Sequence, residues 1–285
     1  MVTKNRPATK ADLVADAAAL SAAITDHLVN DWIDVGLLDA PTRAGAGRGK
    51  GSKPALFSVN QRRLFAELIR RRAETHKIAQ LARIPMHWWV CQEDGFIPTR
   101  QARKAFQTWG QDIRKVSLKN ADVAARAWVK QVAADHAPDK EVNELTTLMA
   151  QVANQGRLDD MGELEGLLDI VIDPEGSGKR LGSPGLYAEA KQYVTSMVRS
   201  QVALNHVLDG TLADHMLLTA RKHQRQSIAE YLTRQNLFSA LSPSYRPAEF
   251  KIPLDNQEIF EQICPSLLLI IGALYYPDKD TDVRG

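Results

Sequence analysis

Cysteine is scarce in this sequence, with only Cys91 and Cys264 among 285 residues. Two cysteines so far apart do not form the disulfide framework of a small secreted domain. They also lack the close spacing that metal binding or thiol sensing needs. The first twenty residues are charged early and lack the apolar centre of a secretory signal. We therefore expect a protein of the reducing cytoplasm.

Long hydrophobic runs are lacking as well. The longest, at 263–276, has 14 residues and contains Pro265. A helix that spans a bilayer needs about 20 apolar residues. We expect this segment to be a buried helix or an interface, and we expect no membrane anchor. The hydrophobic share of 44% and the charged share of 25% are typical of an ordinary globular protein with a real core.

Positive charge is concentrated in one part of the chain. The whole sequence has a net charge of +2, but residues 43–72 contain nine Arg and Lys residues and only Glu67 as an acid. Their net charge is therefore +8, and the other 255 residues sum to −6. Such a local concentration indicates a polyanionic partner, whereas an isolated charge run is usually only a solvated surface.

Apolar residues recur at helical spacing along almost the whole chain. Ile24, Leu28, Trp32 and Val35 stand at i, i+4, i+8 and i+11, which predicts a helix with Trp32 in the core. Gly36 supplies its C-terminal stop. The same periodicity predicts helices within 10–20, 58–84, 98–113, 120–136, 140–156, 186–208, 212–235 and 263–276.

Local signals predict where several of these helices begin and end. Thr9 and Ser58 are expected N-caps, and Pro85 is expected to end the helical run that follows Ser58. The segment 176–185, GSGKRLGSPG, is the clearest loop. The one good strand candidate is 55–58, with a possible partner before Gly45.

The order of these elements predicts the fold. Two short helices, a turn, a Gly-rich basic ribbon and a further helix are the outline of a winged helix-turn-helix. We expect a mainly all-α protein: an N-terminal winged helix-turn-helix with a short β-ribbon wing, followed by a helical C-terminal domain. The expected domains are the DNA-binding domain at 1–78, a helical connector at 79–136, and a domain for oligomerisation, partners or effectors at 137–285.

Residues 9–75 resemble the DNA-binding domain of the mercury-resistance-regulator (MerR) family. The family carries an aromatic residue, three intervening residues, then Gly-Leu-Leu and a nearby Pro, which correspond here to Trp32, Gly36-Leu37-Leu38 and Pro41. A basic wing and a short aromatic strand follow in the family, and 43–54 and 56–58 correspond to them. The family has an Arg just before its aromatic pair, where Asn30 stands here. The resemblance implies binding to double-stranded DNA.

The residue types in this region suggest how DNA would be contacted. In the second helix, Thr25, His27 and Asn30 are the expected base contacts, because their side chains can hydrogen-bond to base edges in the major groove. Asp26, Asp31 and Asp34 stand in the same helix and repel phosphate. Backbone or minor-groove contacts are expected from Arg43, Arg48, Lys50, Lys53, Arg62 and Arg63. Arg100, Arg103 and Lys104 can extend this surface.

Patterns of catalysis and metal binding are lacking. The segment 176–180, GSGKR, has Arg180 where a phosphate loop needs Ser or Thr, and Asp173 where it needs Gly. His206, His215 and His223 lack the i, i+4 spacing of a metal-binding helix. Trp88 and Trp89 are expected in the core rather than in a second DNA-binding unit. We expect no enzyme activity, no cofactor and no metal.

Three functions remain open from the sequence. The leading hypothesis is a sequence-specific transcriptional regulator, a repressor, that forms homo-oligomers or binds a protein partner through its C-terminal helices. The second is an architectural DNA-binding factor of a phage or plasmid, in excision, partition or replication. The third is a helical protein-binding scaffold whose basic segment is only solvated. The first two place the protein on the nucleoid in the cytoplasm.

Overall fold

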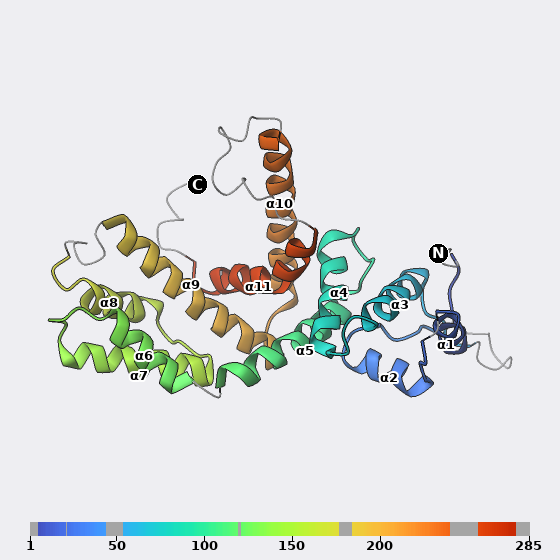
Figure 1. Cartoon of the computed structure of the whole chain (residues 1–285), viewed down its shortest axis with the longest axis horizontal. Coiled ribbons are helices and arrows are strands. Elements are labelled where there is room, and N and C mark those ends of the chain that lie inside the picture. Colours follow the sequence, from blue (N-terminus) through green and yellow to red (C-terminus); the bar gives the residue numbers. More distant parts are fainter. Residues whose placement is uncertain are drawn as a thin grey trace. The chain divides into compact units, whose positions relative to one another are not determined.

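The chain is mainly helical, as Figure 1 shows for the computed structural model. The structure describes residues 5–20, 22–43, 54–118, 121–176, 184–239 and 256–277. These residues contain eleven helices and no strand. The predicted mainly all-α class is therefore confirmed.

The helices follow one another in the order given by the labels of Figure 1. They are α1 (Lys10–Ala18), α2 (Asp26–Asp34), α3 (Val59–Arg72), α4 (Ile78–Cys91), α5 (Thr99–Leu118), α6 (Ala121–Val132), α7 (Asp139–Gln155), α8 (Met161–Ile172), α9 (Pro184–Leu208), α10 (Asp214–Ser239) and α11 (Asn256–Tyr275).

The chain forms two compact units. One comprises Met1–Gln111 and Gln224–Cys264, and the other Asp112–His223 and Pro265–Gly285. The boundaries lie within α5, α10 and α11, and not at residues 78 and 136. The compact units do not test whether 1–78, 79–136 and 137–285 fold and function as separate domains. These three expected domains therefore stay a prediction.

Short-range hydrogen bonds fix the ends of the first helices. Thr9 and Asp12 form a capping box at α1, in which the Thr9 hydroxyl accepts from the Asp12 backbone N–H and the Asp12 carboxylate accepts from the Thr9 N–H. Thr25 and Ser58 cap α2 and α3. The predicted caps at Thr9 and Ser58 are confirmed. Gly36 follows α2 with φ 77°, a conformation that favours glycine.

The core of the first unit lies between α1, α2, α3 and α4. Trp32 is fully buried and its ring lies 5.7 Å from that of Phe65 on α3, which confirms the prediction that Trp32 is a core residue. Val29 is also fully buried, whereas Leu28 is half-buried. The buried face of α2 is therefore rotated slightly from the predicted stripe.

Two buried glutamines connect the turn after α2 to α3 and α5. The Gln61 side-chain oxygen accepts from the Asp39 backbone N–H at 2.8 Å, and its amide nitrogen donates to the Gln101 side chain at 2.7 Å. Gln101 donates in turn to the Leu37 carbonyl at 3.1 Å. A Cβ at Gly36 would stand 2.5 Å from the backbone of Ala105 on α5. Close packing as well as backbone conformation therefore requires glycine here.

Pro85 does not end the helical run that follows Ser58, so that prediction is wrong. Pro85 is buried inside α4, and the run breaks earlier, between Arg72 and Ile78. Proline costs a helix one backbone hydrogen bond and causes a clash with the preceding turn. In α4 the packing of neighbouring residues around the buried Pro85 ring outweighs this local cost.

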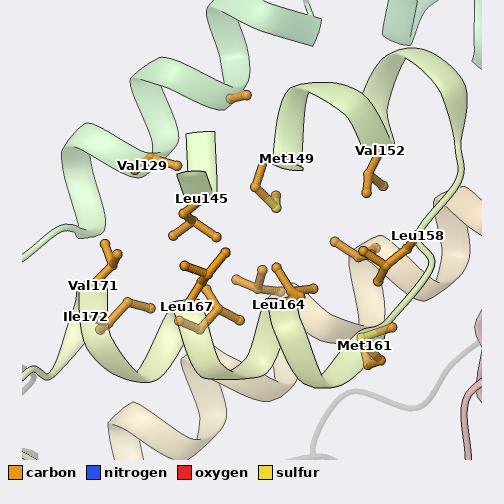
Figure 2. Close-up of a cluster of buried hydrophobic side chains, with 14 of the residues drawn as sticks. Val129, Leu145, Met149, Val152, Leu158, Met161, Leu164, Leu167, Val171 and Ile172 are labelled. Atoms are coloured by element: carbon orange, nitrogen blue, oxygen red, sulfur yellow. The ribbon is translucent and has the colours of Figure 1, made fainter. Parts of the chain in front are cut away.

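The second unit has a separate core, which Figure 2 shows in close-up. Leu145 from α7 and Leu164, Leu168 and Val171 from α8 are fully buried in it, and Val129 joins them from α6. The turn after α7 is held by Gly156, which has φ 58° and lies against Asn205 of α9. The Asn205 amide donates to the carbonyl of Gln155.

Helix α11 is the apolar helix expected near the C-terminus. Between Gln257 and Tyr275 it is long and apolar enough to cross a bilayer, and 33% of the most apolar part is buried in the protein. The core helix of a soluble protein meets the same criteria of length and composition. Ile263, Cys264, Leu267 and Ile271 are fully buried, and burial of Cys264 raises the pKa of its thiol.

Truncation of Trp32 tests the core of the first unit. We expect Trp32→Ala to lower the free energy of unfolding by roughly 3–5 kcal/mol, the usual cost of a large cavity. Trp32→Phe should cost less, because the indole N–H is buried without a hydrogen-bond partner in the described residues and nothing is lost with it. Urea denaturation followed by circular dichroism measures both. A loss below about 1 kcal/mol for Trp32→Ala would contradict the buried position.

Candidate nucleic-acid interface

Backbone hydrogen bonds close the basic segment at its base. Thr42 and Leu56 exchange two backbone hydrogen bonds at 2.9 and 2.8 Å, and Ala8 and Phe57 exchange two at 3.1 and 2.8 Å. Both pairs are antiparallel bridges, and Phe57 is buried. Leu56 thus pairs with Thr42, a residue before Gly45, through an isolated bridge only, and the expected strand at 55–58 does not form. These isolated bridges are all the β-pairing in the described residues, so the predicted β-ribbon is not supported.

The cations of the expected wing lie mostly beyond this base. Arg43 directly follows Thr42 and is exposed. Arg48, Lys50 and Lys53 lie outside the described residues, as does most of the expected loop at 176–185. What the structure establishes is that the chain leaves at Thr42 and returns at Leu56, its hydrogen-bonding partner.

The outer face of α2 presents the three expected base contacts to solvent. Thr25, His27 and Asn30 are exposed. The Thr25 hydroxyl accepts from the Leu28 backbone N–H at 3.2 Å, so its first role is that of an N-cap, and its own proton remains available. The Nδ1 atom of His27 lies 3.0 Å from the Asp31 carboxylate. With Nδ1 protonated toward Asp31, Nε2 is an acceptor.

A lysine that the sequence patterns did not single out lies beside Asn30. Lys10, at the start of α1, donates to the Asn30 side-chain oxygen at 2.6 Å. Lys10 therefore occupies the Asn30 oxygen and leaves the two N–H donors of the Asn30 amide unused by this contact. Lys10 also adds a positive charge to a helix that exposes Asp26, Asp31 and Asp34. No spacing rule relates residues 20 apart, so only the packing of α1 on α2 identifies this lysine.

Arg62 belongs to the fold and not to the interface, which corrects the sequence-based assignment. Its side chain is 4% exposed and forms two hydrogen bonds with the Asp16 carboxylate, at 2.6 and 2.9 Å. It also donates to the Arg6 carbonyl at 3.3 Å. The Asp16 carboxylate raises the pKa of the Arg62 guanidinium. The pair connects α3 to α1, and a phosphate cannot reach it.

The neighbouring residue, Arg63, is exposed instead. Its guanidinium donates to the Asn5 side-chain oxygen at 3.0 Å, a neutral partner that leaves its charge unpaired among the described residues. Two further arginines of α3 are neutralised. Arg70 and Arg71 both pair with Glu67 and Glu74, at 2.5–3.5 Å. The charge of residues 43–72 is therefore partly compensated, and Glu74 lies just beyond that range.

Arg100 does not add a free positive charge to the candidate interface. Arg100 forms a two-pronged ion pair with Asp39, at 2.9 and 2.7 Å. Trp89 is buried, as predicted, while Trp88 is half-buried with its ring 5.5 Å from that of Phe96. Trp89 is therefore a core residue as predicted, whereas the expected core position of Trp88 is met only in part.

Comparisons with known proteins give no further assignment. No protein-family model, curated protein or solved structure matches the chain. Within the residues that the structure describes, no group of three His, Cys, Asp or Glu side chains could hold a metal ion. The candidate interface therefore consists of the α2 face, Lys10, Arg43 and Arg63, together with the basic residues beyond the Thr42–Leu56 pair.

Adjacent arginines of α3 provide a matched test of these roles. We expect Arg62→Gln to lower the free energy of unfolding by about 1–3 kcal/mol, because Asp16 loses its charged partner. Arg63→Gln should change stability by less than about 0.5 kcal/mol, yet reduce the salt slope of binding to a random-sequence duplex by about 0.9. Urea denaturation and fluorescence anisotropy at several salt concentrations measure the two effects. Equal stability of the two variants would contradict the assignment.

Proposed function

We propose that the protein is a sequence-specific DNA-binding transcriptional regulator, a repressor, that acts on the nucleoid in the cytoplasm. The observation that carries this proposal is the Thr42–Leu56 pairing. It closes a segment with four basic residues, Arg43, Arg48, Lys50 and Lys53, in the same compact unit that exposes His27 and Asn30 on α2. A closed cationic segment and an exposed short helix are the two parts of a winged helix-turn-helix, in agreement with the resemblance to the MerR DNA-binding domain.

In this mechanism the two parts have separate tasks. The cations after Thr42 neutralise phosphates and supply affinity for any DNA, which depends steeply on salt. The α2 face supplies base discrimination. His27 Nε2 can accept from a base amino group, and the Asn30 amide can donate to a base acceptor. The three aspartates on α2 favour a tilted approach that keeps them away from phosphates, with Lys10 offsetting part of their charge.

The C-terminal helices, α9 among them, are proposed to provide oligomerisation or partner binding. Tyr193 and Met197 stand one turn apart on α9 and are 65% and 43% exposed. Large apolar side chains that stay exposed at helical spacing favour contact with another helix. Two copies joined in this way would present two DNA-binding units to a symmetric operator.

Two other functions compete with this proposal. An architectural factor of a phage or plasmid would use the same unit without strict base discrimination, and the exposed aspartates on α2 favour it. A protein-binding scaffold would not need DNA at all. Selection of bound duplexes from a random library separates the three. A palindromic consensus supports the regulator, a bare A·T preference the architectural factor, and no enrichment the scaffold.

Removal of the basic residues tests the source of affinity. We expect replacement of Arg43, Arg48, Lys50 and Lys53 by Ala to weaken binding to every duplex sequence and to lower the salt slope, since each phosphate contact contributes about 0.9 to it. Anisotropy titrations between low and physiological salt measure the slope. A variant with Arg70, Arg71, Glu67 and Glu74 all changed to Ala serves as control, because these two positive and two negative charges already compensate one another. An unchanged slope in the fourfold variant would remove the segment from the interface.

Single changes on α2 test base discrimination. We expect His27→Ala or Asn30→Ala to relax the selected consensus at one or two positions and to cost about 1–3 kcal/mol at the preferred site. Binding to unrelated duplexes should hardly change. Ala at Asp34, which is exposed on the same helix, is the control and should retain the consensus. If both variants select the parental consensus, α2 is not the recognition helix.

A further inference from the structure

The first unit contains a groove of whose lining residues the DNA-binding proposal uses only Arg63. It has a volume of about 780 Å³ and lies between the end of α1, the turn before α2, α3 and Trp88. This volume is within the range of small-molecule sites, about 300–1,000 Å³. Its apolar lining residues include Leu20, Ile24, Ala66, Ile69 and Trp88.

Cations line the same groove. Arg63, Arg70 and Arg72 contribute three positive charges, and Glu67 is the one acid among the lining residues. Glu67 is already bound by Arg70 at 2.5 Å. Arg63 contacts a neutral amide, and Arg72 lies 5.8 Å from the Trp32 ring centroid. Among the described residues, neither Arg63 nor Arg72 pairs with a carboxylate, so the groove combines an apolar body with two uncompensated guanidinium groups.

We propose that this groove binds a small apolar carboxylate, a medium-chain or aromatic acid, with its hydrocarbon part on the apolar walls and its carboxylate on Arg63. Charge complementarity selects an anion over a neutral lipid, because guanidinium groups bind carboxylates by paired charge-assisted hydrogen bonds. A volume of about 780 Å³ accommodates a small molecule rather than a protein helix several turns long.

The position of the groove also provides a route to regulation, which rests on the proposed DNA-binding function. Ile24 forms part of its wall and directly precedes Thr25, the N-cap of α2. Arg63 is one of the candidate phosphate contacts, and a carboxylate bound to its guanidinium neutralises the charge that would attract a phosphate. A bound acid should therefore weaken DNA binding, as an inducer does.

Isothermal titration calorimetry of the full chain with octanoate tests the site, with octan-1-ol as the uncharged analogue and no DNA present. We expect octanoate to bind with a dissociation constant below about 1 mM and at least tenfold more tightly than octan-1-ol. Arg63→Gln should weaken octanoate about tenfold and leave octan-1-ol within twofold. Lys104→Gln is the matched control, since Lys104 is exposed on α5 and is not among the residues that line the groove, and it should change octanoate binding by less than threefold.

Filling the groove tests its location. Ala66→Phe on α3 and Ala23→Phe, at an exposed lining position before α2, should each weaken octanoate and octan-1-ol more than tenfold, with folding checked by circular dichroism. No binding of octanoate by the parent chain, or unchanged binding in both filled variants, would overturn the proposal. Equal affinity for octanoate and octan-1-ol would overturn the choice of an anion. A change of sedimentation in the filled variants would assign the groove to a second copy of the chain instead.

The effect on DNA is measured separately. Octanoate should raise the dissociation constant of a random-sequence duplex for the parent chain but not for Ala23→Phe. If the chain binds octanoate and does not bind DNA, the proposed ligand site is supported and the proposed DNA-binding function is wrong. If the chain binds both without mutual effect, the regulatory part is wrong.

Discussion

The buried amide pair of Gln61 and Gln101 is the constraint on which the first unit depends. Both side chains are almost completely buried, and each donates and accepts, so neither amide can turn over without leaving buried polar groups unpaired. Gln61 and Arg62 are neighbours in the first turn of α3. Gln61 fixes the turn after α2, while Arg62 fixes α1 through Asp16. One helical turn therefore sets the positions of both helices that precede it.

Local chemistry made much of this unit predictable from the sequence. The caps at Thr9 and Ser58, the stop at Gly36 and the burial of Trp32 depend on residues within a few positions of each other, where spacing rules apply. The compensation of Arg70 and Arg71 by Glu67 and Glu74 also follows helical spacing and could have been found in the same way.

Contacts between distant residues could not be predicted from spacing. Arg62 and Arg63 are identical in type and adjacent, yet one is buried on Asp16, 46 positions away, and the other is exposed. The net charge of a segment does not predict which residue each of its arginines contacts. Lys10 beside Asn30 depends on how α1 packs on α2. Pro85 stays inside α4 because tertiary burial outweighs its local cost, and that balance is not visible in a single sequence.

The backbone pairing of Thr42 with Leu56 limits how far the basic residues can act. Fourteen peptide units join these two positions, and an extended chain advances about 3.4 Å per residue. A chain that must return to its starting point can extend over roughly half its contour, about 24 Å. One turn of B-DNA rises about 34 Å. For the DNA binding proposed above, the Thr42–Leu56 pairing would hold the backbone contacts of one unit to less than one turn of duplex, and a longer site would require a second unit.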